Sequence, residues 1–114
     1  MLEILLPLAM VQSVPAVDPP LDLEQQAAVR CSAAFAVVGH GQQSGNAEAL
    51  AYPLVNERGR EFFVRTAARL MDERGLTRDQ VTMLMREQAQ TLWDDDAVEA
   101  VMPGCLLLLD ASGL

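Results

Sequence analysis

The sequence predicts an all-α protein, a compact irregular bundle of four main helices and one short helix, tied together by one disulfide. Three observations lead to this fold class. Apolar residues recur at helical spacing through most of the chain. Helix-starting motifs precede two of the longest such segments. Finally, the sequence does not contain the several strand-like segments that a sheet would need. Because only 4% of the residues are aromatic, we expect a core of Leu, Val, Ala and Met.

The first main helix is expected over residues 23–38. Asp22 is a suitable N-cap, and Gln25 three residues later completes a capping box. Residues 39–41, Gly-His-Gly, are expected to end this helix, since glycine adopts the left-handed conformation common at C-termini. The predicted inner face has five residues near 3.6-residue spacing: Leu23, Ala27, Cys31, Ala34 and Val38. A polar loop and a short helix over residues 47–52 follow.

The second main helix is expected over residues 55–74, with Gly75 as its C-cap and Gly59 as a weak point in its first turns. Its predicted inner stripe is Val55, Phe62, Phe63, Ala67, Leu70 and Met71. Thr77 and Gln80 form a second capping box and start the third main helix. The acidic run that follows, residues 94–96, is expected to end that helix and to cap the last one, because carboxylates suit the positive end of a helix dipole.

The last helix contains a proline and a run of four leucines. Its apolar stripe continues in phase across Pro103, which indicates either one helix with a kink or two short coaxial pieces. Residues 106–109 are all leucine and cover most of the helix circumference. Such a helix is either central to the core or covered by another molecule, in which case Leu106 and Leu107 form an interaction surface.

The two cysteines indicate a structural disulfide between Cys31 and Cys105. Each cysteine lies in phase with the inner face of its helix, and two leave no thiol unpaired. They could also be two buried free thiols, which is the default state in the cytoplasm. Two cysteines and one histidine fall short of the four close ligands of a zinc site, so we expect no metal or cofactor.

The chain is predicted to hold one domain behind an export signal. Residues 1–16 contain an apolar run followed by small residues and are expected to be a signal peptide, although no Lys or Arg precedes the run. An apolar arm packed on the domain is the alternative. Residues 17–22 form a linker, and residues 23–112 form a single helical domain. The first segment is too short to span a bilayer and is broken by Pro7 and Pro15, so no transmembrane span is expected.

The only histidine, His40, is the one candidate for a catalytic base. We expect it in an exposed loop between two glycines. A hydrolase would also need a carboxylate and a nucleophile, and the sequence shows neither at a recognisable spacing. A small hydrolase centred on His40 is therefore the weakest of the functional hypotheses.

Composition and the leucine run favour a non-catalytic protein. A formal net charge of −8 argues against nucleic acid as a partner, because phosphate binding depends on clustered positive charge. We expect a periplasmic or secreted protein that acts by binding a protein partner or by self-association. The alternative is a periplasmic stress chaperone that exposes apolar surface at low pH, when carboxylates become protonated.

Overall fold

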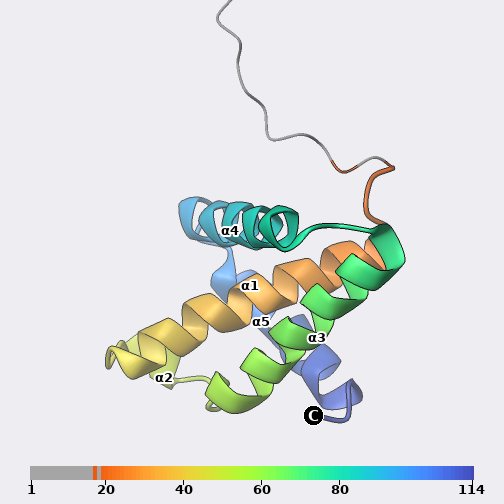
Figure 1. Ribbon diagram of the computed structural model, residues 1–114. Coiled ribbons are helices and arrows are strands. Elements are labelled where there is room, and N and C mark those ends of the chain that lie inside the picture. Colours follow the sequence, from red (N-terminus) through yellow and green to blue (C-terminus); the bar gives the residue numbers. More distant parts are fainter. Residues whose placement is uncertain (1–16, 18) are drawn as a thin grey trace, which may run out of the picture.

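The computed structural model describes residue 17 and residues 19–114, and every regular element in this part of the chain is a helix. The helices are α1 (Leu23–Gln43), α2 (Ala47–Leu50), α3 (Asn56–Arg74), α4 (Arg78–Asp94) and α5 (Val98–Ala111) (Figure 1). The predicted all-α fold, with four main helices and one short helix, is therefore confirmed. The predicted signal peptide lies outside the described residues.

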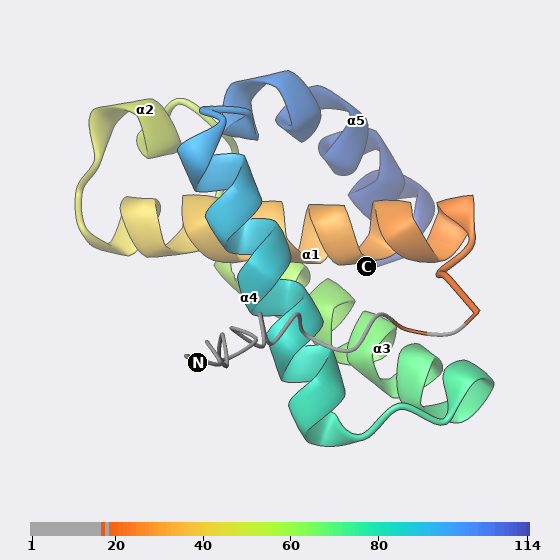
Figure 2. The same cartoon turned by 90° about the horizontal axis from the view of Figure 1, so that it is seen from above.

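Helix α1 lies at the centre of the bundle and contacts each of the other four helices. Figure 2 shows that α4 crosses α1 steeply and that α3 and α5 lie on opposite sides of α1. Because neighbours surround α1, the five consecutive residues 31–35 are all buried. The central helix is thus the first one and not the leucine-rich last one. Leu23, which was predicted to point inward, lies in the first turn of α1 and is 83% exposed.

The C-terminal end of α1 corrects one prediction. The helix does not stop at Gly39 or Gly41 but continues to Gln43. A Cβ on Gly39 would lie 2.8 Å from Asn56 Oδ1, and a Cβ on Gly41 would lie 2.8 Å from Ala49 Cβ. Glycine occurs here because α3 and α2 approach α1 closely, and the backbone keeps its helical conformation.

Gln42, the second-last residue of α1, is buried and joins α1 to the segment before α3. Its Nε2 donates to the carbonyl oxygens of Ala49, at 3.0 Å, and Pro53, at 2.9 Å. Its Oε1 accepts from the backbone N–H of Val55 at 3.2 Å. These bonds fix the end of α1 against α2 and against the segment that leads into α3.

Helix α3 packs on α1 through Gly59, which was predicted to be a weak point. A Cβ on Gly59 would lie 2.9 Å from Phe35 Cβ, so the missing side chain makes room for the aromatic residue. Phe35 also meets Phe62 edge to face, with ring centroids 5.4 Å apart. Gly75 ends α3 with φ of +64°, as predicted. Met71, predicted to point inward, is exposed.

Helix α4 begins with the predicted capping box. Thr77 Oγ1 accepts from the backbone N–H of Gln80 at 3.2 Å, and Gln80 Oε1 accepts from the backbone N–H of Thr77 at 2.8 Å. The acidic run after α4 does not cap α5, contrary to prediction. Asp96 adopts a left-handed conformation with φ of +50°, so Ala97 becomes the N-cap of α5 and makes no side-chain cap bond.

The disulfide predicted between Cys31 and Cys105 is present and joins α1 to α5. The Cα atoms lie 5.1 Å apart, within the usual range for a disulfide. Both residues are buried within the larger apolar cluster of the core, which also contains Met102 and Leu109. Helix α5 is one helix that includes Pro103, which decides between the two alternatives for this segment.

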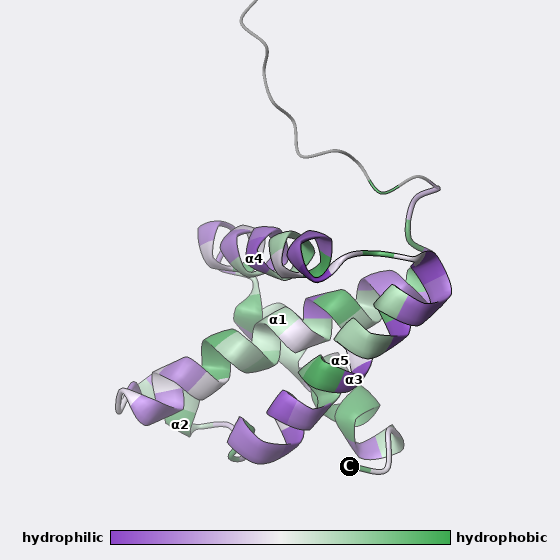
Figure 3. Cartoon of the chain, viewed as in Figure 1, coloured by the Kyte–Doolittle hydropathy of each residue, from purple (hydrophilic) through white to green (hydrophobic). Residues whose placement is uncertain are grey.

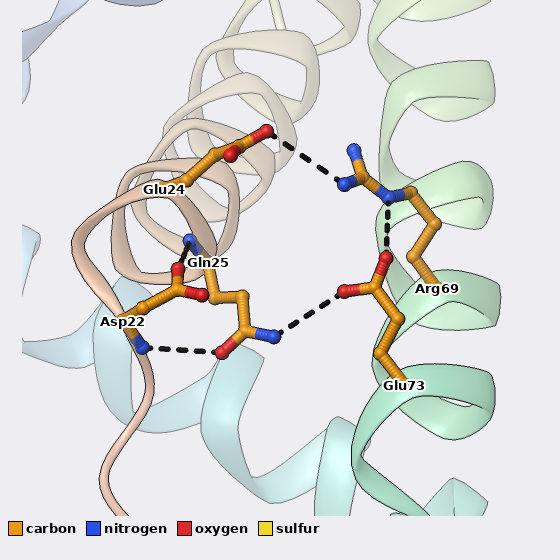
Figure 4. Close-up of polar contacts among 5 residues, drawn as sticks. All are labelled: Asp22, Glu24, Gln25, Arg69 and Glu73. Atoms are coloured by element: carbon orange, nitrogen blue, oxygen red, sulfur yellow. Dashed lines mark hydrogen bonds and ion pairs between the residues drawn. The ribbon is translucent and has the colours of Figure 1, made fainter.

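A polar network joins the start of α1 to the end of α3 (Figure 4). Asp22 Oδ1 accepts from the Gln25 backbone N–H at 2.7 Å, which confirms the first capping box. Gln25 Nε2 donates to Glu73 Oε2 at 3.3 Å, and Arg69 lies 3.3 Å from Glu73 and 3.7 Å from Glu24. Exposed ion pairs of this kind contribute about 0–1 kcal/mol each, so the network orients the helices more than it stabilises them.

Candidate interaction surface

Helix α5 has one face in the core and one face in solvent. Met102, Cys105 and Leu109 are buried on the inner side. The solvent side, here called the outer α5 face, has five exposed uncharged residues spaced i, i+3, i+4, i+7 and i+11: Ala100, Pro103, Gly104, Leu107 and Ala111. Figure 3 shows the visible part of α5 mainly as hydrophobic, whereas α4 alternates between hydrophilic and hydrophobic. An apolar strip therefore extends along most of α5.

The leucine run divides between this face and the core. Leu107 is 71% exposed and is the largest side chain of the outer α5 face. Leu106 and Leu108 are partly buried and pack against the core cluster, and Leu109 is buried. Of the two residues predicted to form an interaction surface, Leu107 is exposed, whereas Leu106 is partly buried and packs against the core.

Gly104 is a feature of this face that sequence reasoning did not single out. A Cβ at this position would meet no atom within 4 Å, and its φ is not positive. Glycine in a helix interior costs about 0.5–1 kcal/mol relative to alanine, so the residue destabilises α5 with no compensating contact among the described residues. Its effect is to leave the helix backbone open to close approach from outside. The signal in the sequence was a Pro-Gly pair inside an otherwise helical pattern.

The C-terminal end of α5 is held firmly by two arginines of α3. Arg58 Nε donates to the carbonyl oxygen of Leu114 at 2.7 Å, and its guanidinium pairs with Asp110 at 2.8 Å. Arg65 donates to the carbonyl oxygen of Ser112 at 3.0 Å. These contacts and the disulfide on the inner side attach α5 to α3 and α1 and leave the outer α5 face in solvent.

His40 lies in α1 and not in the loop where it was predicted. It is exposed, and its side chain makes no hydrogen bond or ion pair with another described residue. A hydrolytic histidine is normally oriented by a carboxylate and bonded to a nucleophile, and neither contact is formed at His40. In the part of the chain that the structure describes, no group of three or more His, Cys, Asp or Glu side chains is placed to hold a metal ion.

Comparison of the chain with protein-family models, with curated proteins and with solved structures finds no match in any of the three. Among the described residues, no helix has both the length and the hydropathy required to cross a membrane. The protein's role is therefore inferred from its own surfaces.

Proposed function

We propose that this protein acts by binding another protein through the outer α5 face and has no catalytic activity of its own. The observation that supports this most directly is the uncharged, exposed strip along α5, with Leu107 prominent and the backbone of Gly104 open. An apolar helix face without an intramolecular neighbour is typical of a surface that a partner covers.

The chemistry of the face suggests how a partner would bind. Small residues on both sides of Leu107 let another backbone approach closely, and Leu107 would fill an apolar pocket of the partner. A partner helix laid along α5 would satisfy both requirements, because its own side chains would pack into the gap at Gly104.

The same proposal places the protein in the periplasm or outside the cell. The support is the disulfide between Cys31 and Cys105, since such bonds persist in oxidising compartments and are rare where thiols are kept reduced. Recovery of the oxidised protein from an envelope or culture fraction would test this part.

A photo-crosslinking amino acid at position 107 tests the surface in living cells. The matched control is the same amino acid at Val64, an apolar residue of α3 that is 57% exposed and does not belong to the outer α5 face. We expect a specific adduct from position 107 and none from position 64, and we expect Gly104→Arg to remove that adduct. Equal adducts from both positions, or none from position 107, would contradict the proposal. An adduct of twice the protein's mass would identify the partner as a second copy.

A further inference from the structure

The part of the chain that carries the outer α5 face is strongly acidic. Residues 87–114 contain six Asp or Glu residues and no Arg, Lys or His. Three of the six are consecutive, at residues 94–96, and Glu99 follows in the first turn of α5. These four carboxylates are exposed, and none of them forms an ion pair with another described residue. One end of the outer α5 face therefore lies beside four solvated negative charges.

The other end of α5 is different, because arginines of α3 reach it. Asp110 lies 2.8 Å from the guanidinium of Arg58. Arg65 donates to the carbonyl oxygen of Ser112 at 3.0 Å. Negative charge without an ion-pair partner among the described residues is therefore concentrated at the start of α5.

The two long edges of the outer α5 face also differ. Glu99 and Asp110 are eleven residues apart, which is about three helical turns, so they lie along the same edge. Val101 and Leu108 are seven residues apart and lie along the opposite edge, where both are partly buried against the core. A helix packed on this face would meet carboxylates along one edge and hydrocarbon along the other.

We propose that the occupant of the outer α5 face is a basic amphipathic helix of another protein, an inference that rests on the proposed function above. The apolar stripe of that helix covers Leu107 and packs against the open backbone of Gly104. Arginine or lysine side chains along one of its edges pair with Glu99 and with residues 94–96.

The position of the acidic residues also sets the direction of the partner helix. Basic side chains are most favourable near the C-terminus of a helix, where they complement its dipole. A partner that runs antiparallel to α5 places that end beside residues 94–96. An antiparallel helix thus has its most favourable basic positions where the negative charge of this chain is concentrated.

The same charges argue against a second copy of this chain as the occupant. Each copy has a formal net charge of −8 and would bring the same acidic run to the interface. Like charges brought together oppose association and slow the encounter of the two molecules. A basic partner is instead attracted to the face before it makes contact.

The proposal is tested by measuring how three fluorescent helical peptides bind the full oxidised chain. Each has about 18 residues and the same stripe of Leu and Ala. The first has arginines along one edge of its C-terminal half, the second has them in its N-terminal half, and the third has glutamates in place of the arginines of the first. We expect saturable binding of the first peptide, about threefold weaker binding of the second and at least tenfold weaker binding of the third. Raising NaCl from about 50 to about 500 mM should remove most of the difference between the first and the third.

A variant with three carboxylates removed tests the residues themselves. It is Asp95→Asn, Asp96→Asn, Glu99→Gln, which keeps the size of each side chain. Asparagine also tolerates the left-handed conformation of residue 96. This variant should bind the first peptide about tenfold more weakly than wild type, because attraction to the arginines is lost.

The matched control removes the same amount of charge from exposed positions outside α5. It is Glu48→Gln, Asp72→Asn, Glu87→Gln, with one change in each of α2, α3 and α4. Binding of the first peptide should change by less than about twofold, since only long-range charge is affected. Gly104→Gln, which covers the open backbone without adding charge, should weaken the first peptide at least tenfold.

Three results would overturn the proposal. They are absence of saturable binding by the first peptide, equal binding of the first and third peptides at low salt, and equal effects of the two triple variants. Sedimentation of the protein alone as a dimer that Gly104→Gln dissociates would also overturn it, because the occupant would then be a second copy. The proposed function is decided separately, by whether position 107 gives a specific adduct in cells.

Discussion

The contact between α1 and α3 and the outer face of α5 both contain glycine within a helix, but for different physical reasons. At Gly39 and Gly59 a Cβ would lie 2.8 Å from Asn56 and 2.9 Å from Phe35, so each glycine permits two helices to touch. At Gly104 a Cβ would meet nothing within 4 Å. A neighbouring atom that a Cβ would touch explains why a helix has glycine at that position. At Gly104 no described residue supplies such an atom.

The two regions also differ in how they are held. Helix α1 is surrounded by neighbours, and residues 31–35 are all buried. Helix α5 contributes only one face to the core, and the disulfide and two arginines attach it. Helix α5 is therefore held by one packed face, the disulfide and a few polar contacts, whereas α1 is held by packing around most of its circumference.

The largest expected effect comes from removing the disulfide that links the two regions. The bond joins residues 74 positions apart, and closing a loop of that length stabilises a protein by roughly 4 kcal/mol on a chain-entropy estimate. The double variant Cys31→Ala, Cys105→Ala should lose about that much free energy of unfolding in urea titrations. Wild-type protein measured with reductant is the control. Equal stability of oxidised wild type and double variant would mean that packing alone holds α5.

Gly59→Ala should be the next largest effect. The added methyl group would press on Phe35, and overpacking of this kind costs about 1–3 kcal/mol. The measurement is the midpoint and slope of denaturant unfolding. A neutral result would show that α3 can shift away from α1 and that the close contact is not required.

Thr77→Ala tests a site that belongs to neither region and depends only on local contacts. Loss of the capping bond to Gln80 should cost about 1 kcal/mol. In a domain of this size, that lowers the melting temperature by roughly 4–8 °C. Thr77→Ser, which keeps the hydroxyl, is the control and should melt close to wild type. If both variants melt alike, the cap does not contribute.

Gly104→Ala should have the smallest effect and the opposite sign to Gly59→Ala. The methyl group meets no atom, and alanine is favoured over glycine in a helix by about 0.5–1 kcal/mol. Thermal melts of the isolated protein should show the gain, while adduct formation from position 107 should fall. A loss of stability would show that Gly104 has a structural role, and the contrast with Gly59 would disappear.

Much of the local structure could be predicted because its signals act over a few residues. Both capping boxes, at Asp22 with Gln25 and at Thr77 with Gln80, are present because the groups that bond lie three positions apart. The left-handed C-cap at Gly75 follows from the same local rules. Exposure within the leucine run was predicted in part, since a helix of consecutive leucines must expose some of them, and Leu107 is the one exposed.

By itself, the sequence determined the all-α class and most helix starts, because capping and helical periodicity are properties of neighbouring residues. With two cysteines it also predicted the pairing of Cys31 with Cys105, but the tertiary structure decided that bond over two free thiols, because it brings residues 74 positions apart together. Only the tertiary structure decided which helix is central, where α1 ends and which leucine of α5 is exposed. Gly39 continues a helix that a glycine often ends, because Asn56 of α3 packs against it.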